Sequence, residues 1–503
     1  MFAKVLSMPK LSISPGLVAL LSGAVMSFAA APFSFWWLAW IALVPLWLAV
    51  VNPSSKPARL GLLWGIGYYG VTLHWITGLH PLMWLGIPWI GSIAIVAFAW
   101  TFITLWGAIG VSLWAWGMAW IARRKLTAWQ QVLIGVALWC GIETIRQASP
   151  LDWAPLAFTQ SPHNLAILHL GQISGAMTVT GAIVLVNGLI VQAFLSHRLR
   201  FGTSAIAGVL MLHLIGFGLF SIDQPATDAI RVGIVQGNVP TREKLFENGL
   251  KLALNHYSIA YRALSNQNAE LVVTPEGALP ILWQGLDRTR NSIYQAVLAQ
   301  QVPILLGTFV PEGNGYTQSL IAIDGNGDTV GRYNKIKLVP LGEYMPFEKL
   351  FGRLSPIKSY LLPGAVHQLV KTPVGRVIVG ICFDSAFPEV FRHQAAQGGQ
   401  FIVTASNLDP YSQVLMAQHQ AQDVMRSIET DRWAVRATNT GYSGIVDSHG
   451  QVKWRSNPNR FEFEAAMIER RQTQTLYVRW GNWLTPTLLI ISAILVLKHR
   501  DAN

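Results

Sequence analysis

The longest stretches without a charged side chain set the strongest limit on how this chain can fold. Residues 11–55 contain no Asp, Glu, Lys or Arg, and neither do residues 60–122. Up to residue 222 the only acidic residues are Glu143 and Asp152. Charged residues make up 12% of the chain, whereas soluble domains contain about 25%. The first half of the chain therefore has the composition of a membrane protein.

Eight apolar segments are candidates for membrane-spanning helices, because a helix that crosses a bilayer needs about 20 mostly apolar residues. Seven of them precede a polar block from about Ala229 to Arg471, and one follows it. They are Ser14–Ala31, Phe35–Val51, Leu60–Leu79, Ile87–Ala119, Trp129–Ile145, Ile173–Ser196, Thr203–Ser221 and Trp483–Leu497. The first has no good cleavage site and is followed at once by the second, so we do not expect it to be a cleaved signal peptide.

The positions of Lys and Arg predict the orientation, since these residues gather on the cytoplasmic side of a membrane protein. Outside the polar block most of them form five short clusters. The clusters are Lys4 with Lys10, Lys56 with Arg59, Arg123 to Lys125, Arg198 with Arg200, and Lys498 with Arg500. With eight crossings, all five fall on one side, so we expect both termini in the cytoplasm and the polar block on the opposite face. The net charge of +12 then reflects topology and not nucleic-acid binding.

The polar block alternates strand-like and helix-like segments. We expect strands at Ile230–Gln236, Glu270–Thr274, Pro303–Thr308, Leu320–Ile323, Thr329–Asn334, Val377–Cys382, Phe401–Ala405, Gly444–Asp447 and Val452–Trp454. We expect helices at Phe246–Asn266, Asp287–Gln300, Phe387–Gln397 and over most of Tyr411–Ala437. This alternation is typical of an α/β domain with helices on the faces of its sheets. The predicted fold is a polytopic α-helical membrane bundle with eight transmembrane helices and an inserted α/β domain.

Three chemically useful residues each stand just past a predicted strand, which is where α/β folds gather reactive groups. They are Glu276, Lys335 and Cys382. A thiol needs a base before it can attack a carbonyl, and the resulting oxyanion needs a positive donor. Together the three residue types suit acyl transfer. Taken singly, Glu276 and Lys335 could be solvated loop residues and Cys382 a small buried hydrophobe.

Glu143 and Arg146 lie three residues apart in the fifth span and therefore share a helix face. Charges at membrane depth are costly and tend to be paired or functional. The two residues could form a structural pair that supports the bundle, or they could contact the headgroup of a phospholipid. The histidines lack metal-ligand spacing, so we expect no metal site, and no motif calls for a cofactor.

Several longer motifs resemble one family. They are Val235-Gln-Gly-Asn-Val-Pro240, Thr274-Pro-Glu-Gly-Ala-Leu-Pro280, Tyr333-Asn-Lys-Ile-Lys-Leu-Val-Pro-Leu-Gly-Glu-Tyr-Met-Pro346, Gly380-Ile-Cys-Phe-Asp384, Arg436-Ala-Thr-Asn-Thr-Gly-Tyr-Ser-Gly444 and Trp139-Cys-Gly-Ile-Glu-Thr-Ile-Arg146. These segments resemble the nitrilase superfamily and, more closely, its membrane branch, the bacterial apolipoprotein N-acyltransferases. The resemblance covers essentially the whole chain, including the order of seven spans, polar domain and final span.

The resemblance implies a nitrilase-like αββα sandwich on the periplasmic face of the bacterial inner membrane. It implies transfer of an acyl chain from a phospholipid donor to the α-amine of an S-diacylglyceryl-cysteine on an apolipoprotein, through a thioester on the enzyme. By motif, Glu276 matches the general base, Lys335 the oxyanion-stabilising lysine, Cys382 the nucleophile and Glu343 a second glutamate. Tyr344, in the same motif as Glu343, is a candidate for substrate contact.

This reading divides the chain into a seven-helix transmembrane domain at 1–222, a periplasmic catalytic domain at 228–472, and a last transmembrane helix with a cytoplasmic tail at 481–503. The partners it implies are a phospholipid, a diacylated apolipoprotein and the lipid bilayer, without a cofactor. We expect a monomer.

The chain departs from the family pattern at a few places. Phe383 and Asp384 follow the nucleophile where the family often has an aromatic residue and Glu, so we expect both to support the site. Leu245-Phe246 occupies the region of a common tryptophan, and Leu151-Asp-Trp-Ala154 replaces a Gly-Phe-Pro-Trp-like stretch. The basic amphipathic stretch Met345–Leu362 is either a core helix or a mobile arm at the bilayer surface.

Two other functions fit parts of the pattern. A membrane-anchored amidase or nitrilase would use the same three residues with water as acceptor, but the long motif at 333–346 and the seven preceding spans argue against it. A transporter with a regulatory polar domain would need ionisable residues or broken helices within its spans. The spans hold few of the former, and we recognise no pair of the latter.

Overall fold

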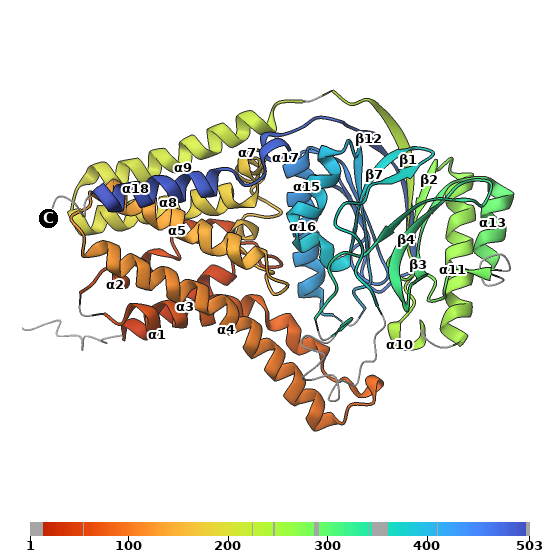
Figure 1. Ribbon diagram of the computed structural model, residues 1–503, viewed down its shortest axis with the longest axis horizontal. Helices are drawn as coiled ribbons and strands as arrows, with labels where there is room; N and C mark the ends of the chain where they lie inside the picture. The colour runs from red at the N-terminus through yellow and green to blue at the C-terminus, as the bar shows by residue number, and fades with distance from the viewer. Residues whose placement is uncertain are drawn as a thin grey trace, which may run out of the picture.

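The computed structural model describes residues 14–53, 55–223, 225–244, 247–285, 291–340, 342–344, 361–409 and 411–498. Within these ranges the chain forms a helical bundle and an α/β domain that lie side by side (Figure 1). The last helix returns from the α/β domain to the bundle, so the polar domain is inserted between helices of one bundle, as the order of segments predicts.

The helices of the bundle cover the predicted apolar segments. They are α1 (Pro15–Ser27), α2 (Val44–Val50), α3 (Pro57–Thr72), α4 (Trp89–Ala122), α5 (Ala128–Gln147), α6 (Leu165–Leu168), α7 (Gly171–Ser174), α8 (Ala176–Ser196), α9 (Leu199–Phe220) and α18 (Leu484–Lys498). In the described part of the chain, four helices are long and apolar enough to cross a membrane, namely α4, α5, α8 and α9. Shorter helices cover the other segments, so the number of eight crossings stays a prediction.

Besides Ile173–Ser196, which Gly175 interrupts near its start between α7 and α8, two predicted spans are not continuous α-helices. The segment Phe35–Val51 forms a 3-10 helix at Trp36–Trp40 and then α2. Pro45 occupies the first turn of α2, where its missing N–H and fixed φ are tolerated; inside a longer helix it would break the backbone hydrogen bonding. The segment Leu60–Leu79 likewise changes from α3 to a 3-10 helix at His74–Leu79. The prediction of uninterrupted helices was wrong at both places.

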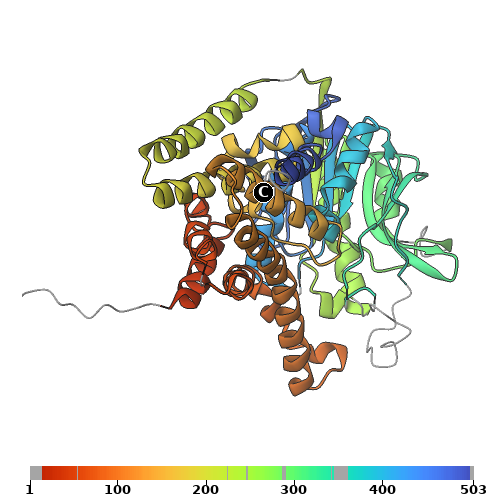
Figure 2. The same ribbon diagram turned by 60° about the vertical axis from the view of Figure 1, so that its left-hand side comes forward.

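Small residues let the first helices of the bundle approach closely. A Cβ atom on Gly23 of α1 would lie 2.0 Å from the backbone oxygen of Trp64 in α3, and one on Gly65 would lie 2.4 Å from Cα of Ala108 in α4. Close backbone contact at small residues is a common way to pack helices in a membrane. Helix α4 has 34 residues and is about 51 Å long. Its N-terminal half projects beyond the neighbouring helices in both views (Figures 1 and 2).

The α/β domain is built from two six-stranded sheets. The first has the order β12-β1-β2-β3-β4-β5 and the second the order β11-β10-β9-β8-β7-β6. Their strands are β1 (Asp228–Gln236), β2 (Leu271–Val273), β3 (Ile304–Glu312), β4 (Gly315–Ile323), β5 (Thr329–Asn334), β6 (Val370–Thr372), β7 (Gly375–Ile381), β8 (Phe401–Ser406), β9 (Ala434–Thr438), β10 (Gly444–Val446), β11 (Val452–Arg455) and β12 (Glu462–Arg470). The strands β1, β2 and β3 are parallel, as are β7, β8 and β9. The strands β2, β8 and β9 are buried along their whole length, which suits parallel strands covered on both faces.

Helices cover the outer face of each sheet. The helices α11 (Glu247–Asn266) and α13 (Ser292–Gln300) lie on the far side from the bundle, and α15 (Pro388–Ala396) and α16 (Gln413–Thr430) lie on the near side (Figure 1). This arrangement is the predicted αββα sandwich. Short helices α10 (Thr241–Lys244) and α17 (Leu476–Trp480) complete the domain. Every residue of α16 from Gln418 to Thr430 is buried, because α16 is enclosed between the second sheet and the bundle.

The predicted helix Tyr411–Ala437 was wrong in its last part. Helix α16 ends at Thr430, Asp431 takes a positive φ of 54°, and β9 begins at Ala434. The strands β6, β9 and β12 were not predicted. These segments become strands because they pair with distant parts of the chain. The strand β12, for example, pairs antiparallel with β1, from Asp228 opposite Arg470 to Gln236 opposite Glu462. No local pattern encodes such a contact.

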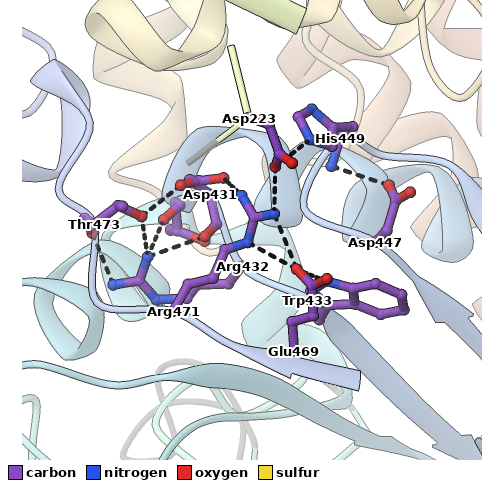
Figure 3. Close-up of polar contacts among 10 residues, drawn as sticks. Asp223, Asp431, Arg432, Trp433, Asp447, His449, Glu469, Arg471 and Thr473 are labelled. Atoms are coloured by element: carbon purple, nitrogen blue, oxygen red, sulfur yellow. Dashed lines mark hydrogen bonds and ion pairs between the residues drawn. The ribbon is translucent and has the colours of Figure 1, made fainter. Parts of the chain in front are cut away.

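Arg471 joins the two segments that connect the α/β domain to the bundle (Figure 3). It follows β12, and its side chain lies 3.0 Å from Asp223 after α9 and 3.1 Å from Asp431 at the end of α16. It also contacts Glu469 at 3.0 Å. The Arg471 side chain is buried, so these contacts fix both connections against the same helix end.

Candidate active site

Lys335 is the centre of the candidate site. It follows β5, is 1% exposed, and its Nζ lies 2.8 Å from Glu276 Oε1 and 2.6 Å from Glu343 Oε1. Burial alone would lower the pKa of Lys335, but the charges of Glu276 and Glu343 outweigh it and hold the pKa well above its usual value. Lys335 is therefore a fixed positive charge with a carboxylate on two sides.

Glu276 follows β2 in the turn Thr274-Pro-Glu-Gly and is 4% exposed. While Oε1 accepts from Lys335, Oε2 accepts a hydrogen bond of 2.7 Å from the backbone N–H of Asn407, just past β8. The Nζ of Lys244, from α10, donates to the backbone oxygen of Glu276 at 3.3 Å. Both carboxylate oxygens thus have donors, which hold the carboxylate in a fixed orientation beside Lys335.

Glu343 shares Lys335 with Glu276. Its Oε2 accepts a hydrogen bond of 2.8 Å from the backbone N–H of Val339. Burial raises the pKa of Glu343, the charge of Lys335 opposes the rise, and the charge of Glu276 adds to it. Glu343 therefore holds a proton more tightly than a carboxylate in water does.

Cys382 begins the turn that follows β7, and its φ is +49°. Its thiol is buried and interacts electrostatically with Glu276, Lys335 and Glu343. Burial raises the pKa of the thiol well above its usual value, and Glu276 raises it further against the opposing charge of Lys335. The resting thiol is therefore neutral, and a base must remove its proton before it can attack. The tertiary structure thus brings together the three residues that the sequence places at strand ends.

Asp384 ties the turn that begins at Cys382 to the segment that carries Lys335. It is fully buried, and Oδ2 accepts from the Tyr333 hydroxyl at 2.9 Å and from the backbone N–H of Ile381 at 3.0 Å. Oδ1 accepts from the backbone N–H of Lys337 at 2.8 Å. Burial raises the pKa of Asp384 to about 6, with the two backbone N–H groups as the main opposing contacts. Asp384 thus links both sides of the site through its hydrogen bonds.

Two aromatic candidates lie at the edge of the site. Phe383 is half-buried, and its ring stacks on Trp153, with centroids 6.1 Å apart and an interplanar angle of 13°. Trp153 belongs to the connection after α5, so this contact comes from the bundle. Tyr344 is half-buried and forms a single β-bridge with Pro340.

Glu143 and Arg146 do not pair with each other. Glu143 Oε1 accepts from Trp139 at 2.9 Å and Oε2 from Thr180 at 2.9 Å. Arg146 forms an ion pair of 2.7 Å with Asp152 and lies over the ring of Tyr69. Both side chains are buried. These contacts favour a structural role in the bundle over contact with a headgroup.

Sequence reasoning missed three residues beside the site. Lys244 contacts the backbone of Glu276, Asn407 donates to its carboxylate, and Tyr411 interacts electrostatically with Cys382. Lys244 lies four residues past the motif ending at Pro240, which was the one signal available for it. The residues 345–360 of the predicted arm and Leu245-Phe246 lie outside the described residues. Among the residues that the structure describes, no cluster of His, Cys, Asp and Glu could hold a metal ion.

Known proteins resemble this chain along its whole length. The family model for the apolipoprotein N-acyltransferase N-terminal domain matches residues 22–189, and that for carbon-nitrogen hydrolase matches residues 231–463. An apolipoprotein N-acyltransferase of Nostoc sp. is 49% identical over 95% of this chain and 99% of its own. Proteins of the same name from Synechocystis sp. and Thermosynechococcus vestitus are 42% and 41% identical, over 93% and 99% of this chain and 98% and 97% of theirs.

Proposed function

This chain belongs to the apolipoprotein N-acyltransferase family, and from that premise we propose its acyl donor, its reaction path and its catalytic residues. The family implies an integral membrane acyltransferase that N-acylates lipoproteins. We propose that the donor is a membrane phospholipid and that the acceptor is the α-amine of an N-terminal S-diacylglyceryl-cysteine. The observation that carries the proposal is Lys335, held between Glu276 and Glu343 beside the buried thiol of Cys382.

In the first step, Glu276 takes the proton of the Cys382 thiol and the sulfur attacks the carbonyl carbon of a phospholipid ester. Lys335 and the backbone N–H of Phe383 stabilise the oxyanion of the tetrahedral intermediate. The intermediate collapses, the carbon–oxygen bond breaks, and the leaving alkoxide of the lysophospholipid receives the proton from Glu276. The acyl chain remains on Cys382 as a thioester.

In the second step, the lipoprotein amine attacks the thioester carbonyl and Glu276 takes a proton from the nitrogen. The same donors hold the second oxyanion. Collapse of this intermediate breaks the carbon–sulfur bond, and the thiolate regains the proton from Glu276. The products are an amide on the lipoprotein and the free thiol, which is ping-pong chemistry.

The resting site is shielded from bulk water. Glu276, Lys335 and Cys382 are all at most 9% exposed, so little water reaches the reacting atoms. Glu343 and Asp384 support Lys335 and the nucleophile's turn, with Phe383 stacked beside them, while Tyr344 borders the substrate's approach.

The placement in the membrane belongs to the same proposal. In this proposal the chain crosses the inner membrane eight times and has both termini in the cytoplasm. The domain at 228–472 lies in the periplasm, and in the chain it falls between the bundle at 1–222 and the final helix at 481–503. The enzyme acts as a monomer. This placement puts the site on the membrane face opposite the cytoplasm.

Mass spectrometry of the full-length protein tests the reaction path. Incubation with phospholipid vesicles that carry a labelled acyl chain should add one acyl mass to the peptide that holds Cys382. Cys382→Ala should remove that mass and the N-acylated product, whereas Cys140→Ala should keep both, because Cys140 is buried in the bundle. Loading of the Cys382→Ala protein, or release of free fatty acid in place of acylated peptide, would count against the proposal.

A further inference from the structure

The backbone at Cys382 has a conformation that needs outside support. A φ of +49° lies in the left-handed region, which residues other than Gly, Asn and Asp rarely adopt. Such strained residues persist only where the surrounding structure holds them. The groups that contact the backbone of Cys382 therefore decide where its thiol points.

His419 of α16 contacts that backbone directly. Its Nε2 lies 3.0 Å from the carbonyl oxygen of Cys382, and the imidazole is 1% exposed. A hydrogen bond in such a buried place is expensive to lose, because the carbonyl would have no water to replace it. The bond holds only if Nε2 carries the hydrogen.

Arg436 of β9 fixes which ring nitrogen carries the hydrogen. Its Nη1 forms a short contact with His419 Nδ1, and the same guanidinium is held by Asp423 through Nε and by Ser406 at 2.8 Å. An arginine side chain has donors and no acceptor. Nδ1 must therefore accept from Arg436, so Nε2 carries the hydrogen and donates it to Cys382.

The surroundings also keep His419 neutral. Burial lowers the pKa of His419 well below its usual value, and the positive charges of Arg436 and Lys335 lower it further. The carboxylate of Asp423 forms an ion pair with Arg436. A neutral imidazole with a fixed tautomer keeps one donor aimed at the Cys382 carbonyl at the pH of catalysis.

The bundle fixes the plane of the ring. Trp153 lies flat on His419, with centroids 5.6 Å apart and an interplanar angle of 6°, and it stacks on Phe383 as well. The Trp153 indole N–H donates to Gln418, the neighbour of His419, at 2.8 Å. The orientation of the imidazole thus depends on contacts from both the α/β domain and the membrane bundle.

We propose that His419 is a positioning residue for Cys382. It acts through the Cys382 carbonyl, holds the strained turn, and thereby keeps the thiol facing Glu276 and Lys335 and the Phe383 N–H facing the oxyanion. The inference rests on the proposed role of Cys382 as nucleophile.

The test compares His419→Leu, which removes the donor, with His419→Gln, whose side-chain amide can still donate. Both are made in the full-length chain with Cys140→Ala, so that Cys382 is the only thiol. We expect His419→Leu to slow acyl-enzyme formation about 10- to 100-fold, because it removes one buried hydrogen bond that also stabilises the transition state. We expect His419→Gln to restore most of the lost rate. His256→Leu is the matched control, because His256 also contacts a backbone carbonyl, that of Gly237 at 2.8 Å, from α11 on the other sheet; it should leave the rate unchanged.

The rate of alkylation by iodoacetamide in detergent, followed from pH 6 to pH 10, measures the reactivity of the Cys382 thiol without any acyl transfer. It should be slowed in His419→Leu and restored in His419→Gln, so a failure of the proposed acyl transfer would leave this arm intact. Equal rates for Leu and Gln, or a His419→Leu rate within about twofold of the parent, far below the loss expected for a buried hydrogen bond, would overturn the proposal.

The wild-type chain gives a second measurement if His419→Leu does not fold. In ¹⁵N-histidine NMR spectra, assigned by difference with His419→Gln, His419 should be neutral with hydrogen on Nε2 from pH 5 to pH 8. Hydrogen on Nδ1, or a protonated ring in that range, would refute the assigned geometry.

Discussion

Asp384 offers the sharpest test of how the site is built, because its carboxylate accepts three hydrogen bonds in a fully buried place. In Asp384→Asn, one oxygen becomes an amide NH₂ of almost the same size. If the NH₂ takes the place of Oδ1, it faces the N–H of Lys337; if it takes the place of Oδ2, it faces the N–H of Ile381. Either way one buried backbone N–H loses its acceptor, which costs about 1–3 kcal/mol.

The titration of Asp384 gives this prediction a pH dependence. Its pKa is raised from 3.8 to about 6, so the folded protein binds the proton more tightly than the unfolded chain. The stability that protonation supplies is fully present below pH 3.8 and is lost as the pH rises through about 6. Between pH 5 and pH 7 the wild type should lose about 1 kcal/mol relative to Asp384→Asn, which cannot titrate.

Thermal unfolding in detergent measures this change. A change of 1 kcal/mol shifts Tm by about 2–4 °C for a domain of 150–250 residues, so the Tm of the wild type minus that of Asp384→Asn should be about 2–4 °C larger at pH 5 than at pH 7. A Tm difference that is the same at both pH values, or larger at pH 7, would show that burial does not dominate the pKa of Asp384 and would refute the reasoning.

The same substitution should affect the reaction. A loosened turn displaces the Cys382 thiol, and a displacement of about 1 Å can slow an enzyme about 100-fold, so we expect acyl-enzyme formation to fall about 10- to 100-fold in Asp384→Asn. Asp384→Glu adds a methylene to an enclosed site and should also be slow, because overpacking shifts the backbone. A fully active Asp384→Glu would mean that the three hydrogen bonds do not set the geometry.

Three further predictions concern other parts of the molecule. Lys335→Met should reduce acyl-enzyme formation at least about 100-fold, since it removes the oxyanion donor, with labelled-lipid loading as the measurement. Gly23→Ala should lower Tm, because its Cβ would lie 2.0 Å from Trp64 O, while Gly218→Ala, with nothing within 4 Å, should not; equal effects would contradict the packing of α1 on α3. Arg471→Met should destabilise the fold by about 3–5 kcal/mol through the unpaired buried Asp431, seen as a lower Tm, and an unchanged Tm would argue against the junction in Figure 3.

Local patterns predicted a large part of the fold. Charge-free stretches predicted where the bundle helices lie, because in a bilayer an apolar helix satisfies its own backbone and needs no distant partner. Apolar runs of strand length predicted β1, β7 and β8, and helical spacing predicted α11, each within a few residues. The breaks at Pro45 and after Thr72 were missed, since hydropathy reports burial in lipid and not helix continuity.

The sequence likewise predicted some features of the candidate site and not others. Glu276, Lys335 and Cys382 could be chosen from the sequence because each follows a strand and sits in a family motif. The sequence could not predict which groups surround each of these three side chains. Asp384 looked like a shorter substitute for Glu, yet its three donors come from β5, from the loop after Lys335 and from the end of β7. His419 stood in a helix pattern with no chemical signal.

The sequence by itself determined which segments are apolar enough to enter a membrane, which residue types could react, and the family to which the chain belongs, because hydropathy and motifs are properties of neighbouring residues. Only the tertiary structure decided the electrostatics. The neutral thiol of Cys382, the shared charge of Lys335 and the fixed tautomer of His419 arise where segments far apart in the chain exclude water from one place. Burial and partners of this kind depend on contacts across the fold, and no stretch of sequence contains them.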